Sequence, residues 1–131
     1  MSNVKEVFHL REELEKSFSY CQAVKVGKTL YISGSVSWDQ DGNVLGKGDF
    51  KVQIRNAYNE IKKTLEAYGA TFDNIVKETL YTTDMEALNN AAPIRAEFFK
   101  NVKPAASTWA GVTQLAIPDT LIEIEAIAEL P

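Results

Sequence analysis

The sequence predicts an α+β domain in which a mixed β-sheet carries two helices on one face. Three observations support this prediction. Residues 121–130 alternate with the period of two that is typical of a half-buried strand. Residues 49–69 place apolar side chains three and four positions apart, as one stripe of a long helix does. Short segments rich in β-forming residues precede and separate two helical patterns. At this length we expect one domain, residues 1–131.

The N-terminal third is expected to contain three strands followed by a loop. Residues 11–16 form a charged connection with room for one helical turn, and Gly27-Lys28 indicates a tight hairpin turn. The register of the second strand stays open, because its apolar residues do not alternate cleanly. Residues 34–48 hold four of the seven glycines and predict a loop. The three strands are expected at residues 4–10, 20–27 and 29–33.

The first long helix is expected to begin after Asp49 and to end before Gly69. Asp49 suits the N-cap, and Gly69 suits the position just past the end, where a left-handed conformation is common. One stripe of such a helix packs on a sheet. The stripe consists of Ile54, Tyr58, Ile61, Leu65 and Tyr68.

The C-terminal half is expected to continue with a strand at residues 76–83 and a helix from residue 85 or 86 to residue 99. Pro93 interrupts that helix, because proline removes a hydrogen bond and clashes with the preceding turn. Either the helix begins at Ala91–Ala92 with Pro93 in its first turn, or it kinks at Pro93. Residues 106–112 predict a further strand, and residues 113–119 predict a loop before the last strand.

The last strand has one apolar face and one acidic face. The apolar face is expected to lie on the core, so the acidic face meets water, another subunit or a ligand. Ile122, Ile124, Ala126, Ala128 and Leu130 form the apolar face, and Glu123, Glu125, Ile127 and Glu129 form the other.

Composition excludes several classes of function. The net charge of −4 and the lack of a basic run argue against nucleic acid as a partner. One cysteine, Cys21, and one histidine, His9, exclude an internal disulfide and the common Cys- and His-rich metal sites, so we expect no metal and no cofactor. We find neither the apolar core of a signal peptide nor a span of about 20 apolar residues, so we expect no membrane partner and a cytoplasmic location.

Several short runs resemble the RidA/YjgF family of small trimeric enamine/imine deaminases, also known as endoribonuclease L-PSP. The resemblance covers nearly the whole chain, and the final run is the most specific. These runs are Tyr31-Ile32-Ser33-Gly34, the segment from Gly69 through Asp73-Asn74-Ile75-Val76-Lys77, Phe98-Phe99, Pro104-Ala105, and Ile122-Glu123-Ile124-Glu125-Ala126-Ile127-Ala128.

The resemblance implies a chorismate-mutase-like fold and a homotrimer. In that arrangement the sheets line a central barrel, the helices lie outside, and small-molecule clefts lie between adjacent subunits. The acidic face of the last strand would then look toward such a cleft rather than toward bulk water.

The site residues of deaminating family members carry over unevenly. Glu123 matches the glutamate that would hold or polarise the attacking water. Tyr20 stands where the family has an early tyrosine, and Ser33 and Gly34 match the small edge of the pocket. The remaining positions depart from the pattern. Ala106 stands where the family has its substrate-binding arginine, Thr108 stands at the position of the cysteine, and the position of the asparagine falls on or near Ala92.

The missing arginine bears directly on the substrate. An arginine–carboxylate contact is strong, and removal of one partner costs roughly 2–5 kcal/mol. We therefore expect a poor 2-iminoacid deaminase, with capture weakened roughly 30- to several-thousand-fold. Arg95 could supply a replacement guanidinium, or it could be an ordinary solvated residue.

Each site residue also has a purely structural interpretation. Glu123 could be a surface charge, Tyr20 and Thr108 could be structural, and Trp109 could pack in the core or in a subunit interface, pointing away from Thr108. Three functions remain open on this basis: a deaminase or hydrolase acting at an intersubunit cleft, a non-catalytic small-molecule-binding trimer, and, less favoured, a ribonuclease or translation inhibitor.

Overall fold

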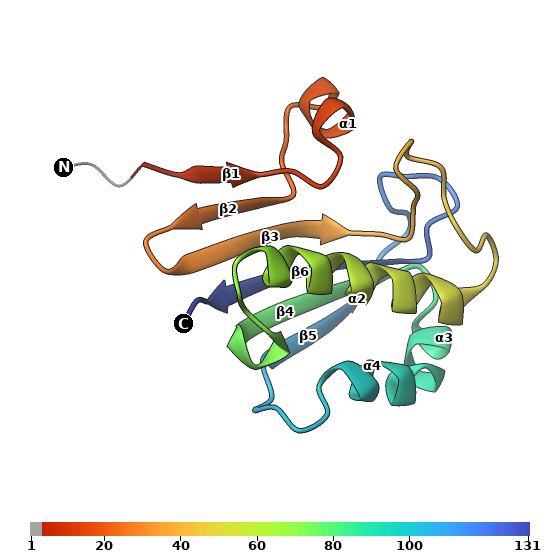
Figure 1. Cartoon of the computed structure of the whole chain (residues 1–131). Coiled ribbons are helices and arrows are strands. Elements are labelled where there is room, and N and C mark those ends of the chain that lie inside the picture. Colours follow the sequence, from red (N-terminus) through yellow and green to blue (C-terminus); the bar gives the residue numbers. More distant parts are fainter. Residues whose placement is uncertain (1–3) are drawn as a thin grey trace.

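The computed structural model describes residues 4–131, which form one mixed six-stranded sheet beside a long helix (Figure 1). The strands are β1 (Glu6–Phe8), β2 (Ala23–Val26), β3 (Thr29–Ser35), β4 (Ile75–Thr82), β5 (Ala106–Gly111) and β6 (Ile122–Glu129). Their order across the sheet is β1-β2-β3-β6-β4-β5. Only the β4–β5 pair is parallel among these strands, and the other pairs are antiparallel. The predicted α+β class and mixed sheet are confirmed.

The helices are more numerous than the sequence predicts. They are α1 (Glu12–Ser17), α2 (Phe50–Ala67), α3 (Met85–Asn90) and α4 (Ala92–Phe98), with a short 3₁₀ turn η1 (Phe72–Asn74) before β4. Helix α2 crosses one face of the sheet, and α4 packs beside it (Figure 1). The opposite face of the sheet, which we call the open face, carries no helix in this view.

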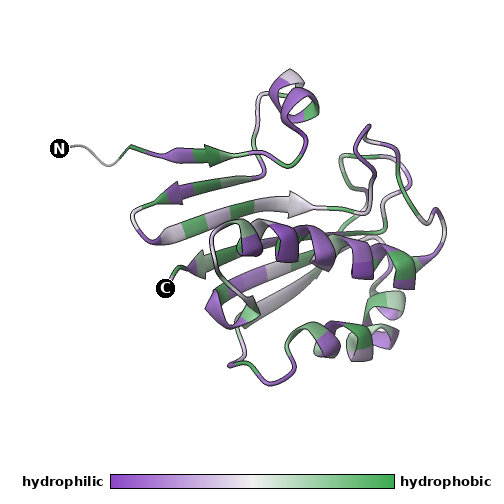
Figure 2. Ribbon diagram, viewed as in Figure 1, coloured by the Kyte–Doolittle hydropathy of each residue, from purple (hydrophilic) through white to green (hydrophobic). Residues whose placement is uncertain are grey.

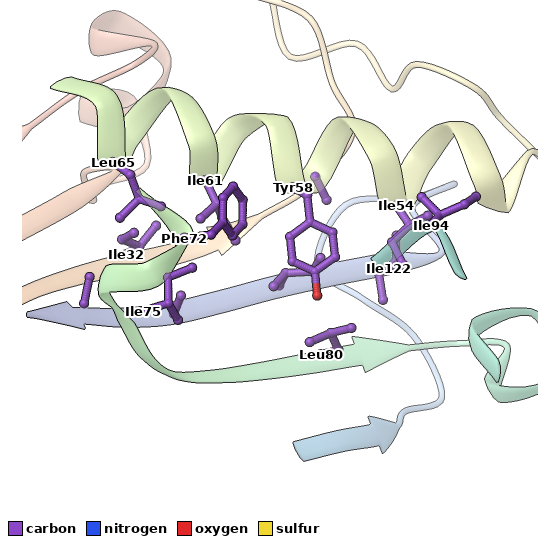
Figure 3. Packing of buried hydrophobic residues seen from close by; sticks show 14 of the residues in the cluster. Ile32, Ile54, Tyr58, Ile61, Leu65, Phe72, Ile75, Leu80, Ile94 and Ile122 are labelled. Carbon is purple, nitrogen blue, oxygen red and sulfur yellow. The ribbon is translucent and has the colours of Figure 1, made fainter. Parts of the chain in front are cut away.

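The core lies between α2 and the sheet. Ile54, Tyr58, Ile61 and Leu65 are all at most 1% exposed and point toward the strands (Figure 3). Tyr68 ends the predicted stripe but is only partly buried, where it packs edge-on against Phe8. Polar residues cover the outer surface of α2 (Figure 2). The predicted stripe is therefore the core-facing side of this helix.

Both predicted ends of α2 are confirmed. The Asp49 carboxylate accepts a hydrogen bond from the amide of Val52 at 3.2 Å, which satisfies one free donor of the first turn. Gly69 follows the end of the helix with a φ of +69°, a conformation that favours glycine.

Pro93 divides the second helical region into two helices instead of kinking one. Helix α3 ends at Asn90, Ala91 serves as the boundary residue, and Pro93 lies in the first turn of α4. Proline is tolerated there because the first amides of a helix have no intrahelical acceptor. Of the two predicted alternatives, the helix that begins at Ala91–Ala92 with Pro93 in its first turn is confirmed, and the kinked single helix is wrong.

Strand β6 has the predicted faces. Ile122, Ile124, Ala126 and Ala128 are buried, whereas Leu130 lies beyond the strand and is half-buried. None of the helices in residues 4–131 is both long and apolar enough to cross a membrane.

Candidate functional site

A cavity of about 340 Å³ lies at the end of the sheet where β3 ends and β6 begins. Four separate parts of the chain meet there: the turn after α1, the end of β3, the loop at residues 116–117, and the start of β6. Four of the six predicted site residues line this cavity: Tyr20, Ser33, Gly34 and Glu123.

A β-bulge in β3 shapes the floor of the cavity. Ile32 pairs with Ala126 and Ser35 pairs with Ile124, so Ser33 and Gly34 together oppose a single residue of β6. A bulge bends the strand locally and redirects its side chains, and bulges are common beside functional sites. The pattern of apolar and polar residues in this part of the sequence does not indicate the extra residue.

Gly34 provides the space for the Glu123 carboxylate. A Cβ atom built on Gly34 would lie 1.9 Å from Oε2 of Glu123, far inside contact distance. The requirement for glycine is therefore steric and does not come from its backbone angles. The carboxylate is held against the backbone of β3 and faces the cavity.

The Glu123 carboxylate is half-buried, and it has no hydrogen-bond donor or ion-pair partner within residues 4–131. Burial raises the pKa of this carboxyl above its usual value, and the negative charge of Glu125 raises it further. A carboxylate with a raised pKa is a stronger base, which suits it to accept a proton from water.

Tyr20 supplies a protonated phenol to the lining of the same cavity. Ser19, at a φ of +61°, turns the chain sharply after α1 and directs Tyr20 to the cavity. Burial, followed by the negative charge of Glu15, raises the pKa of Tyr20 to about 12. Its hydroxyl therefore remains a hydrogen-bond donor at neutral pH.

Ser33 shapes the cavity, but its polar groups are already engaged. Its amide donates to the carbonyl of Gln22 at 2.8 Å, and its hydroxyl donates to the carbonyl of Cys21 at 2.6 Å. The Ser33 amide is therefore not free to polarise a ligand.

Two aromatic residues of the cavity, Phe18 and Trp38, were not predicted from the sequence. Trp38 lies in the loop after β3, where Arg11 fixes its position by donating to the carbonyls of Trp38 at 2.9 Å and Asp39 at 2.7 Å. The same guanidinium stacks over the Trp38 ring at 5.3 Å and pairs with buried Glu60. A tryptophan within a glycine- and aspartate-rich loop was the available signal, since loops often carry binding residues.

The other two predicted site residues, Ala106 and Thr108, lie outside this cavity. They are exposed on β5, at the edge of the sheet, and pair in register with Lys77 and Thr79. Because Thr79 also pairs with Glu125, Thr108 shares the open face of the sheet with the acidic side of β6. A single chain does not bring Ala106 or Thr108 to Glu123.

Arg95 belongs to a polar cluster between the sheet and the helices. Glu78, 1% exposed, accepts hydrogen bonds from Arg95 Nε at 2.8 Å and Nη2 at 2.5 Å, from the Tyr58 hydroxyl at 2.8 Å, and from the Ser107 hydroxyl at 2.6 Å. The guanidinium also lies over Phe99 at 4.4 Å. Arg95 is thus neither an ordinary solvated residue nor a replacement anchor in the cavity.

The remaining candidates have structural surroundings. Trp109 packs against the core and donates to Ser107 at 3.1 Å, on the side of β5 away from Thr108, as the strand alternation predicts. His9 contacts Glu15 at 2.7 Å. Burial raises the pKa of the Cys21 thiol, which makes it a poor nucleophile. Within residues 4–131, no three His, Cys, Asp or Glu side chains gather where they could hold a metal ion.

Comparison with known proteins places this geometry in context. The family model described as Endoribonuclease L-PSP matches residues 11–130. A RutC family protein of Sulfurisphaera tokodaii is 39% identical over 82% of this chain and 85% of its own length. The human 2-iminobutanoate/2-iminopropanoate deaminase is 34% identical over 83% of this chain and 78% of its own length. Among solved structures, YyfA of Yersinia pestis, from the conserved Rid protein family, superposes with a TM-score of 0.87 at 29% identity, covering 97% of this chain and all of that chain.

Proposed function

Because this chain belongs to the RidA/YjgF family, whose model is named Endoribonuclease L-PSP, we propose that it hydrolyses an imine or enamine of a small metabolite to a carbonyl compound and ammonia. The observation that carries the proposal is the half-buried carboxylate of Glu123, which has no partner within residues 4–131 and is held over Gly34 at the wall of a cavity. The 34% identity to a human deaminase supports the class of reaction.

In the proposed mechanism Glu123 accepts a proton from a water molecule as the oxygen adds to the imine carbon. The Tyr20 hydroxyl, which lines the same cavity, donates a hydrogen bond to the reacting group. The proton then passes to the nitrogen, the carbon–nitrogen bond breaks, and ammonia leaves. One imine and one water give one carbonyl compound and one ammonia, and neither oxidant nor cofactor is required.

We further propose that the working form is a homotrimer with the site at the subunit boundary. The face of the sheet without helices exposes 49% of Tyr31 beside a hollow of about 240 Å³, and such a surface suits contact with a second copy of the chain. In this arrangement β5 of a neighbouring subunit would bring Ala106 and Thr108 to the cavity. Both side chains are uncharged, so the proposed substrate lacks the carboxylate that an arginine would bind.

The test is ammonia release from imines that are generated in the assay by an amine oxidase or by an amino-acid oxidase. We expect the wild type to accelerate hydrolysis of at least one imine, and Glu123→Gln to lose roughly 10²- to 10⁴-fold of that acceleration. Glu129→Gln is the matched control, because Glu129 lies on the same face of β6 but bonds Thr29, away from the cavity.

Equal turnover in wild type and Glu123→Gln would remove Glu123 from the mechanism. No turnover of any imine, together with tight binding of a small ligand, would favour a non-catalytic binding protein.

A further inference from the structure

We propose that the cavity beside Glu123 selects small organic cations that carry an apolar group, such as the protonated imine of a simple amine, and rejects carboxylates. The inference deepens the proposed function, on which it rests for the reaction that follows binding. The selection itself is argued from the charges and surfaces of the cavity.

The first argument is the charge of the lining. In the described part of the chain, Glu123 is the only charged side chain that lines the cavity. Its carboxylate is half-buried, and no donor or cation of residues 4–131 compensates it. Partial burial weakens the hydration of this charge, so a cationic ligand would gain an interaction that the protein itself leaves unmade.

The second argument is the aromatic wall. Phe18, Tyr20 and Trp38 line the same cavity, and Phe18 is 65% exposed although it is a large apolar residue. Aromatic faces attract cations, and their area also contacts apolar substituents. A cavity with one carboxylate and several aromatic rings suits an ammonium or iminium group with a hydrocarbon portion.

The third argument concerns the cations nearby. Arg11 covers one face of the Trp38 ring, but its guanidinium already bonds Glu60 and two backbone carbonyls, so it is not free to bind an anion. Burial raises the pKa of Tyr20, the negative charges of Glu15, Glu123 and Glu60 raise it further, and the charge of Arg11 lowers it. With Arg11 paired, a ligand in the cavity meets chiefly the charge of Glu123 among the described residues, and this charge attracts cations and repels anions.

The remaining lysines of the described chain lie outside the lining of this cavity. Lys5 and Lys16 border a neighbouring hollow that shares Tyr20, and Lys16 pairs with Glu12. On the open face, Lys77 lies four residues along β4 from Tyr81, which pairs with Glu123, a separation of about 13 Å. Lys47, in the loop after β3, pairs with Asp119. If a neighbouring subunit contributes β5 as proposed, Ala106 and Thr108 add no charge.

The charge preference can be measured with three probes of one shape. Benzamidine, benzamide and benzoate are planar isosteres with charges of +1, 0 and −1, so calorimetric or NMR titration of the full chain isolates the effect of charge. We expect benzamidine to bind roughly tenfold or more tightly than benzamide, and benzoate to bind most weakly. Glu123→Gln should bring benzamidine to the affinity of benzamide, and Glu129→Gln should leave the order unchanged.

Three results would overturn the inference: benzoate binding as tightly as benzamidine, a benzamidine preference that survives Glu123→Gln, or no binding of any probe at millimolar concentration.

Phe18→Ala offers a second variant. Since Phe18 is mostly exposed, this change should keep the fold while it weakens benzamidine severalfold.

Turnover assays separate failure of the inference from failure of the proposed function. Amine oxidase converts benzylamine to a carboxylate-free imine, and amino-acid oxidase converts phenylalanine to a 2-imino acid. Faster turnover of the 2-imino acid would overturn the inference but keep the deaminase function. Preferential benzamidine binding without turnover of either imine would keep the inference and overturn the proposed function.

Discussion

The carboxylate of Glu123 lies directly over Gly34, and its Oε2 atom occupies the place that a Cβ atom of residue 34 would need. The two residues come from different strands, and the bulge in β3 brings them together. The bulge thereby positions Glu123, which is the only charged side chain of the described residues that lines the cavity. The contact with Gly34 can be altered without changing Glu123 itself.

We expect Gly34→Ala to displace the Glu123 carboxylate and to lower imine turnover by about 10²-fold, because small misplacements of a catalytic group have effects of that size. The end of a flexible side chain can move aside, so the free energy of unfolding should change by only about 1 kcal/mol or less. Ammonia release and urea unfolding together check both expectations.

Gly111→Ala is the matched control for this change. A Cβ atom on Gly111 would meet only Met85 Cε, at 3.9 Å, which is ordinary contact. It should therefore change neither turnover nor stability appreciably. Equal loss of activity in both variants would show that Gly34 has no special role.

Glu123→Gln is expected to stabilise the fold near neutral pH although it removes activity. Burial raises the pKa of this carboxyl in the folded chain above its unfolded value of 4.5, so the folded state binds the proton more tightly. The ionised form therefore destabilises the fold at neutral pH, and that penalty disappears as the pH falls through the raised pKa toward 4.5. Melting temperatures of both proteins from pH 8 to pH 4 should converge at the acidic end. A wild type more stable than the variant at pH 7 would contradict this.

The same raised pKa predicts the pH dependence of turnover. Because the reaction needs the ionised carboxylate, activity should fall on the acidic side at a pH above 4.5. Glu129→Gln should retain this profile. An acidic limit below 4.5 would mean that another group acts as the base.

Arg95→Met is expected to destabilise the chain by roughly 3–5 kcal/mol, because it leaves the buried Glu78 carboxylate without its cation. Arg55→Met is the matched control, since Arg55 pairs with Glu97 across α2 and α4 on the exposed surface and should contribute at most about 1 kcal/mol. Urea unfolding at one protein concentration compares the two. Similar losses in both would mean that the Glu78 cluster is not a stabilising network.

Ala106→Arg is expected to create 2-iminoacid hydrolysis, with a gain of roughly tenfold or more in kcat/KM. Ala106 is exposed on β5, so the larger side chain has room. The measurement is ammonia release from a freshly generated 2-imino acid. If the gain is absent while the variant remains assembled, β5 does not face the cavity.

Tyr31→Lys is expected to dissociate the proposed trimer, because it places a charge on the exposed face of the sheet. Light scattering with size-exclusion chromatography should show a shift from a mass near three chains to a mass near one. Val52→Lys, a similar change on exposed α2, should leave the mass unaltered. A wild-type mass of one chain would contradict the trimer directly.

The sequence was most informative where one periodic pattern decides the structure. The stripe on α2 and the two faces of β6 follow from spacing, and both are found except at their last residues, Tyr68 and Leu130, which are half-buried. The Glu78–Arg95 pair could not be predicted in this way, because it joins a strand to a helix through tertiary packing. Phe18 and Trp38 reach the cavity from a turn and a loop, where no period indicates direction.

The bulge in β3 shapes the cavity, but the order of the strands in the sheet does not depend on it. Ile32 and Ser35 both point inward although three positions separate them, so the strand contains one residue more than regular pairing requires. Loss of a single codon at position 33 or 34 would restore an even ladder and leave the sheet order intact. Such a deletion would remove the cavity and keep the fold. Close relatives that differ in length by one residue at this place therefore need not share a substrate.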